Sequence, residues 1–193
     1  MTADFSLNAT NPLTVDFFKQ EGVERIAVSY DCNREQLIEL TTAVPAGLLE
    51  VVIHQHMPMF HMEHCVFCAV LSPGTNKTNC GRPCDDHVVQ LRDRIAVDHP
   101  LTADVGCRNT LFNAVPQSGA EAVRQLIRSG VKHLRVEMLH QGADETIIIM
   151  NMYRKVLRGE VTGTEVWNKL KAANRVGVTR GTLEERRNPL AIL

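Results

Sequence analysis

The stretch from His61 to His87 holds the densest group of side chains that could do chemistry. It reads HMEHCVFCAVLSPGTNKTNCGRPCDDH and contains four cysteines and three histidines. A fifth cysteine, Cys107, follows in ADVGC, and only Cys32 lies apart. The spacing is C-x2-C, then C-x3-C, then the isolated Cys107. Because thiolates are soft donors, this grouping indicates a zinc site or an iron–sulfur cluster.

Three other interpretations of these cysteines stay open. A closed zinc site usually uses two CxxC-like pairs, whereas the second pair here is C-x3-C and a fifth cysteine is within reach. A disulfide framework needs an oxidising compartment, which the sequence does not signal. His64 stands beside Cys65, and a Cys–His pair can carry out hydrolysis, as in a thiol peptidase. Cys32, between a predicted strand and a helix, is interpreted as a buried free thiol.

Polar residues at the ends of predicted strands form a second group of candidates. His54 and His56 follow the third predicted strand, and the carboxyl ends of strands are where α/β proteins place their sites. Arg108 follows Cys107 directly, so its guanidinium could bind a carboxylate substrate or offset a negative cluster. Glu137 ends the fourth predicted strand, and Arg135 shares its face, so a plain salt bridge is the alternative to a catalytic role.

Alternating strands and helices surround the cysteines. Buried or alternating apolar runs predict strands over 4–8, 24–30, 48–54 and 131–139. Caps, glycine stops and amphipathic periodicity predict helices over 11–22, 33–44, 118–130, 144–159 and 162–175. Asn11 and Asn33 are the expected N-caps of the first two helices. The run at 147–150 and Trp167 are expected in the core.

This order predicts an α/β fold, a partial TIM-like (β/α) barrel of about four parallel strands with a cysteine-rich hairpin and loop insertion. We expect a single domain over 1–193, with its parts assigned as follows: a half-barrel over 1–54 and 119–173, the insertion over 55–118 and a tail over 174–193. Four strands do not close a barrel, which usually takes eight. The apolar edge near 4–8 should therefore be paired or shielded. If two copies pair, the contact should include that edge and the helix over 12–18.

Composition narrows the possible partners. The chain has 21 basic and 22 acidic side chains and a formal net charge of −1. Dedicated nucleic-acid binders usually show a clear basic excess, which is missing here. No apolar run is long enough to span a bilayer, and the N-terminus has no secretory signal pattern, so we expect a cytoplasmic protein without membrane contact.

Several motifs together resemble the peptidase U32 family, the collagenase-like group. They are HQHMPMFHMEHCVFCAVLS, CGRPC, LRDR, HPLTADVGCRNTLFNA and LRVEML. The chain is similar to the C-terminal part of a branch of long bacterial and plastid proteins. The resemblance implies oxygen-independent hydroxylation of an RNA base or a small aromatic, with prephenate as the hydroxyl donor. It also implies a [4Fe–4S] cluster beside a TIM-like barrel.

The resemblance further implies the cluster ligands Cys65, Cys80, Cys84 and Cys107. Relatives place their second cysteine farther from the first, so Cys68 is either an alternate ligand that replaces one of the four or a spare thiol. Since the chain resembles only part of a barrel, the resemblance implies a homo-oligomer or a complementary N-terminal barrel chain, with RNA or a small carboxylate as substrate. A cysteine-dependent peptidase and a non-catalytic module with a structural metal, such as zinc, are the alternatives.

Overall fold

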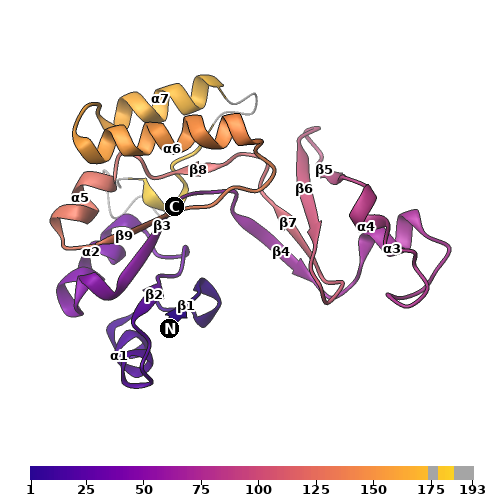
Figure 1. Ribbon diagram of the computed structural model, residues 1–193, viewed down its shortest axis with the longest axis horizontal. Helices are drawn as coiled ribbons and strands as arrows, with labels where there is room; N and C mark the ends of the chain where they lie inside the picture. The colour runs from indigo at the N-terminus through magenta and orange to yellow at the C-terminus, as the bar shows by residue number, and fades with distance from the viewer. Residues whose placement is uncertain (174–177, 185–193) are drawn as a thin grey trace. The chain divides into compact units, whose positions relative to one another are not determined.

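The chain folds into two compact units in the computed structural model, which describes residues 1–173 and 178–184. The first unit combines Met1–Gln55 with Gln117–Leu193, and the second is His56–Pro116. The two are coloured by residue number in Figure 1. The fold is mixed α/β with a parallel-strand sheet and helices, as predicted, and the described residues contain no closed barrel. That the whole chain counts as one domain stays a prediction.

The first unit is built from a five-stranded sheet and five α-helices among the described residues. Its elements in chain order are β1 (Thr2–Ala3), the 3-10 helix η1 (Phe5–Leu7), α1 (Pro12–Gln20), β2 (Arg25–Ala27), α2 (Arg34–Ala43), η2 (Ala46–Leu48), β3 (Leu49–Gln55), β8 (Gln117–Ser118), α5 (Val123–Arg128), β9 (His133–Val136), α6 (Ala143–Arg158), α7 (Gly163–Ala173) and η3 (Gly181–Leu183).

The first two long helices begin where their caps were predicted. The Asn11 side chain accepts a hydrogen bond from the backbone N–H of Thr14, and Pro12 occupies the first turn. Asn33 and Gln36 form a reciprocal capping box at the start of α2. Each cap accepts a hydrogen bond from a backbone N–H group that has no partner within the helix. The start of each helix can therefore be predicted from the local sequence.

Four strands of the sheet run parallel, in the order β1, β2, β3 and β9, while β8 pairs antiparallel with the end of β3. Their side chains alternate between two faces. One face contributes Ile26, Leu49, Val51 and Ile53 to the main apolar core, against which Leu134 and Val136 of β9 also pack. All five α-helices of this unit contribute buried residues to the same core, so this face of the sheet is the one they cover.

The predicted strand over 4–8 is wrong. The first strand is Thr2–Ala3, and Phe5–Leu7 form a 3-10 turn. The Asp4 side chain accepts the Phe5 N–H, and Asn8 closes the turn in a left-handed conformation. Short polar side chains offer the backbone such local partners and so compete with a strand.

Two further expectations changed in detail. The helix predicted over 118–130 is shorter, because Ser118 pairs with His54 in the sheet and α5 covers only Val123–Arg128. The predicted tail over 174–193 lies partly outside the described residues, and its described part contains the 3-10 turn η3. In the run 147–150, Ile149 is buried as expected, but Ile147 and Ile148 are exposed.

The second unit is a four-stranded antiparallel sheet, in the order β4-β7-β6-β5, with two short helices. Its elements are β4 (Pro58–Met62), α3 (Val66–Leu71), α4 (Pro83–Asp86), β5 (Val89–Arg92), β6 (Asp98–Ala103) and β7 (Asn109–Phe112). Phe67, Leu101 and Leu111 are its buried apolar centre.

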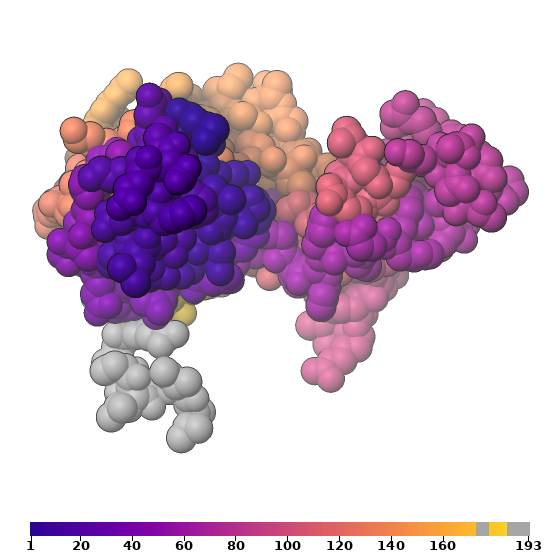
Figure 2. Space-filling view, turned by 90° about the horizontal axis from the view of Figure 1, so that it is seen from below, coloured from indigo at the N-terminus to yellow at the C-terminus, as the bar shows by residue number. Residues whose placement is uncertain are grey.

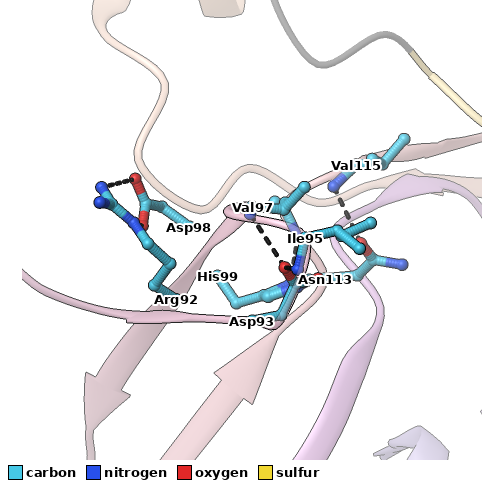
Figure 3. A network of polar contacts seen from close by, with 9 residues as sticks. Arg92, Asp93, Ile95, Val97, Asp98, His99, Asn113 and Val115 are labelled. Atoms are coloured by element: carbon cyan, nitrogen blue, oxygen red, sulfur yellow. Dashed lines mark hydrogen bonds and ion pairs between the residues drawn. The ribbon is translucent and has the colours of Figure 1, made fainter.

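A polar network fixes the turn between β5 and β6 (Figure 3). Asp93 accepts hydrogen bonds from the backbone N–H groups of Ile95 and Val97. His99 Nδ1 accepts the N–H of Ala114, so its Nε2 carries the proton and donates to Asp93 at 3.2 Å. The network thus ties this hairpin to the segment after β7.

Candidate functional site

Four of the five clustered cysteines line one cavity in the second unit. Cys65, Cys68, Cys80 and Cys107 surround a volume of about 470 Å³, together with the loop that contains Lys77. All five thiols of this unit are free. Segments far apart in the sequence therefore contribute thiols to the lining of one cavity.

Cys65 is the N-cap residue of α3, and its sulfur accepts two hydrogen bonds. The backbone N–H of Cys68 donates to Cys65 Sγ at 3.4 Å, and Asn109 Nδ2 donates at 3.8 Å. The Asn109 side chain is fully buried, and its Oδ1 also accepts the Val66 N–H at 2.7 Å. Asn109 of β7 therefore fixes both Cys65 and the start of α3.

The loop between Cys68 and Cys80 is tightly closed. Ser72 Oγ donates to the Cys80 carbonyl at 2.8 Å, and Cys68 Sγ donates to the Gly74 carbonyl at 3.5 Å. A Cβ on Gly74 would come within 2.3 Å of the Asn79 carbonyl oxygen, so no larger residue fits there without a shift. The loop conformation itself places Cys80 beside Cys68.

Two residues at the site adopt left-handed backbone conformations that non-glycine residues rarely take. Arg82, with φ 54°, donates its N–H to Cys80 Sγ at 3.4 Å. Cys107 itself has φ 64° in the turn from Asp104 to Arg108. Such conformations cost energy and cluster at functional sites, so their presence beside two thiols supports a role for this cavity.

Arg108 braces the turn that carries Cys107. Its Nε donates to Asp104 Oδ2 at 2.9 Å, and Asp104 Oδ1 accepts the N–H groups of Gly106 and Arg108. These bonds, the Arg108 N–H first among them, hold the pKa of Asp104 below its usual value. In this structure the Arg108 guanidinium positions a neighbouring cysteine.

Cys84 is not among the residues that line the cavity. It lies in α4 and packs with Cys65 against the apolar centre of the unit. Desolvation raises the pKa of its thiol, and the neighbouring Asp85 adds to the effect. Cys68 shows the same direction, from desolvation first and then from the thiolates of Cys80 and Cys65. Cys68 and Cys84 are therefore the two alternatives for a fourth thiol beside Cys65, Cys80 and Cys107.

The types of donor atom at this cavity fit a metal cofactor, but the side chains are not arranged as a complete set of ligands. Soft thiols surround a cavity, and N–H groups of Cys68, Arg82 and Asn109 point at sulfurs, as they do around cysteine-held clusters. Within residues 1–173 and 178–184, no three or more His, Cys, Asp or Glu side chains are arranged so that they could hold a metal ion. Which thiols ligate, and which cofactor, stay predictions.

His54 lies in a buried hydrogen-bond network of the first unit. A register shift between Val52 and His54 interrupts the β3–β9 pairing, and such bulges re-aim side chains. His54 Nδ1 lies 3.2 Å from the Tyr153 hydroxyl, which also bonds Ser118 Oγ at 2.8 Å and the Ile53 carbonyl. His54 is 1% exposed, so the network ties α6 to β3 and β8.

His56 belongs to the second unit, where its Nδ1 lies 2.8 Å from the Asn113 carbonyl oxygen. His61 lies 2.9 Å from Thr110 Oγ1 across the β4–β7 pair. His64 lines the cysteine cavity, as does Glu63. The structure therefore places His64, which the sequence suggested only as a partner for Cys65, among the thiols.

Glu137 lies in a group of charges on the sheet face opposite the main core. We call this group the charged face; its members are Asp4, Arg25, Glu50, Arg135 and Glu137. Arg135 is at its centre, 2.7 Å from Asp4, 3.3 Å from Glu50 and 3.1 Å from Glu137. Arg25 approaches Glu50 at 3.6 Å. The salt bridge between Arg135 and Glu137 is thus present, within a larger network than the sequence suggested.

Burial dominates the electrostatics at the carboxyl ends of these strands. Desolvation raises the pKa of Glu137 above its usual value even though Arg135 opposes the shift. Desolvation and the carboxylates of Asp31, Glu137 and Asp4 raise the pKa of Tyr30 to about 12. Glu50 and Asp4 were not among the predicted site residues. The alternation of Glu50 with Leu49 and Val51 in a buried strand was the signal that could have found it.

The fold and site together define a class: a mixed α/β protein with a separate antiparallel unit in which four of the five thiols line one cavity. Comparison with protein-family models assigns it further. The model for peptidase family U32 matches residues 1–188 of the 193-residue chain, so the chain belongs to that family.

No curated protein and no solved structure gives a significant match to the chain. Among the described residues, no helix is both long and apolar enough to cross a membrane.

Proposed function

We propose that this member of peptidase family U32 is an iron–sulfur protein that takes part in oxygen-independent hydroxylation. One observation carries the proposal: thiols from three separate segments line one cavity, with N–H donors directed at two of the sulfurs. Four thiolates are the usual ligands of a [4Fe–4S] cluster, and hydrogen bonds to sulfur tune its potential. When bound, such a cluster supplies electron transfer.

The chain's own residues would prepare this cavity in three ways. Asn109 would hold Cys65, the closed loop around Gly74 would hold Cys80, and the Asp104–Arg108 pair would hold the turn of Cys107. Each of these positioning groups is fixed by at least one hydrogen bond to a backbone or side-chain partner. The proposed ligands are Cys65, Cys80, Cys84 and Cys107, as the resemblance implies, with Cys68 as the alternate.

The cofactor is tested by anaerobic purification followed by iron, sulfide and zinc analysis and an absorption spectrum. We expect about four irons per chain and a broad band at about 400 nm. Cys80→Ala should remove the iron, whereas Cys32→Ala is the matched control, because Cys32 is a buried free thiol in the other unit. Stoichiometric zinc, or fresh protein without any metal, would contradict the proposal.

Two further variants decide the fourth ligand. If Cys84 is a ligand, Cys84→Ala loses iron and Cys68→Ala keeps it. The reverse result would leave the cluster in place but assign it to the four thiols that line the cavity. Loss of iron in both variants would mean that both thiols are needed to hold the site.

The reaction needs its own test. Iron-loaded protein would be incubated without oxygen with RNA or a small aromatic and with prephenate as hydroxyl donor. We expect a product with one added oxygen atom in the mass spectrum. A peptidase, the activity in the family name, would instead cleave a collagen peptide without iron and lose that activity in Cys65→Ser. That outcome would replace the hydroxylation proposal.

A further inference from the structure

Cys68 and Cys80 contact the same residue, Gly74, in the cysteine cavity that both of them line. Cys68 Sγ donates to the Gly74 carbonyl at 3.5 Å. A Cβ built on Gly74 would come within 2.7 Å of Cys80 Cα, so the backbones of these two residues touch there. Desolvation and then the charge of Cys80 raise the pKa of the Cys68 thiol. The two thiols are therefore neighbours, although a loop separates them in the sequence.

The loop between the two cysteines is closed by its own hydrogen bonds. Ser72 Oγ donates to the Cys80 carbonyl at 2.8 Å. Asn79 Oδ1 accepts the N–H groups of Thr75 and Asn76 at 2.8 and 3.0 Å. The Cys80 N–H donates to the Asn76 carbonyl at 2.9 Å. Because these bonds already hold the ends of the loop together, one thiol can meet the other in an intramolecular step without a large rearrangement.

The two sulfurs differ in their access to molecules in solution. Cys68 is 6% exposed, whereas Cys80 is partly exposed and follows the exposed stretch 75–79. Figure 2 shows this part of the chain, in magenta, at the surface of the second unit. Thiol exchange depends on access to the attacking sulfur. Cys80 is therefore the thiol that meets a disulfide from solution first, and Cys68 is reached only through Cys80.

We propose that Cys68 and Cys80 are a redox pair that forms a reversible disulfide by exchange with a small disulfide such as oxidised glutathione. The proposal goes beyond the cluster and concerns the chain without metal. The Cys80 thiolate attacks one sulfur of glutathione disulfide, so a mixed disulfide forms and one glutathione thiolate leaves. The Cys68 thiolate then attacks Cys80 Sγ and releases the second glutathione. The two cysteines lose two electrons, which reduce the glutathione disulfide, and their two protons pass to the two glutathione thiolates.

This disulfide and a metal cofactor in the cavity would exclude each other. A metal ligand must be a thiolate, and a sulfur bonded in a disulfide is not one. Cys80 belongs to the proposed ligand set whether Cys68 or Cys84 is the fourth ligand. Oxidation of the pair would therefore close the site to the cluster, a consequence that rests on the proposed function, whereas formation of the disulfide does not.

The test is disulfide mapping of the full chain, which is freed of metal with a chelator, reduced and then equilibrated with reduced and oxidised glutathione. The remaining thiols are alkylated under denaturing conditions before digestion. Trypsin cleaves after Lys77, between the two cysteines, so a Cys68–Cys80 disulfide should join the peptide 35–77 to the peptide 78–92. The joined pair should separate when it is reduced.

Fragmentation of the joined peptides assigns the bond. Cys65 and Cys84, the other cysteine of each peptide, should be alkylated. A Cys65–Cys68 disulfide would remain within the first peptide, and a Cys80–Cys84 disulfide within the second. Either of these results, or alkylation of all the cysteines at every glutathione ratio, would overturn the proposal. Iron content is not a readout here, so failure of the cluster and failure of the disulfide are separate results.

Two variants separate the steps of the exchange. Cys68→Ser should stop at the mixed disulfide, with one glutathione added at Cys80. Cys80→Ser should add no glutathione at Cys68, and glutathione found there would contradict the proposed order. Cys32→Ser is the matched control, because Cys32 is a buried free thiol in the other unit. It should form the Cys68–Cys80 disulfide to the same extent as wild type, and loss of that disulfide would contradict a pair confined to the second unit.

Discussion

Replacing Asn109 by alanine tests the positioning of Cys65. The change removes the acceptor of the Val66 N–H, which lies at 2.7 Å, and the donor to Cys65 Sγ. Asn109 is fully buried, so water does not reach the vacated positions without local opening. A buried backbone donor left without a partner costs about 1–3 kcal/mol. The second unit should lose that amount, a change of roughly 5- to 150-fold in its opening equilibrium.

Native-state hydrogen exchange on the full chain measures this loss directly. Amides of β7 and of the buried residues Leu101 and Leu111 should exchange faster by that factor, while amides of β3, in the other unit, should be unchanged. Asn113→Ala is the matched control. Asn113 also accepts one backbone N–H, from Val115 at 3.0 Å, but it is only partly buried and contacts no cysteine in the bonds described (Figure 3).

We expect Asn113→Ala to cost less than about 1 kcal/mol, since water can replace the lost partner. If the protein binds the proposed cluster, Asn113→Ala should contain as much iron as wild type, whereas Asn109→Ala should contain less. Equal effects of the two variants on exchange and on iron would refute the idea that Asn109 positions the thiol. A loss of protection in β3 would refute the assignment of the effect to the second unit.

Three further variants test other features. Gly74→Ala should reduce iron binding more than Gly106→Ala, because its Cβ would lie 2.3 Å from the Asn79 carbonyl oxygen; equal metal content in the two variants would contradict this. Tyr153→Phe should lower the free energy of unfolding by about 1–3 kcal/mol in urea, because Ser118 loses its buried partner; an unchanged midpoint would contradict it. For Glu137, whose folded pKa is raised, the native state binds the extra proton, so stability is lost as pH rises from the unfolded pKa through the folded pKa. Glu137→Gln should therefore gain stability relative to wild type at pH 7 and not at pH 4; the same difference at both values would exclude titration of this group.

Local sequence was sufficient wherever a structure depends on neighbouring residues. The Asn11 and Asn33 caps each use a partner three residues away, so they could be read directly. The strand predicted over 4–8 was wrong, because the prediction used only the apolar pattern. Asp4 and Asn8 stabilise a turn there that this pattern does not reveal. Parallel order was predictable because helices alternate with strands.

The site could be predicted in composition but not in arrangement. The grouping of five thiols was visible from their spacing. The fact that Cys68 lines the cavity while Cys84 packs against the apolar centre depends on how the loops around Gly74 and Arg82 fold. The contact of His54 with Tyr153 joins β3 to α6, which is far away in the sequence. Such features depend on contacts between segments far apart in the sequence, and local residue patterns do not predict those contacts.

The pairing of β3 with β8 shows where the chain could be divided into two separate proteins. Gln55 and Gln117 face each other across that antiparallel pair, at the points where the chain leaves the first unit and returns to it. They form the base of a hairpin whose loop is the entire second unit. A two-residue turn is enough to join such strands, so the cysteine unit could be replaced by a short Asn-Gly link. The second unit and the first could then be made separately, and each could be tested for the proposed cluster.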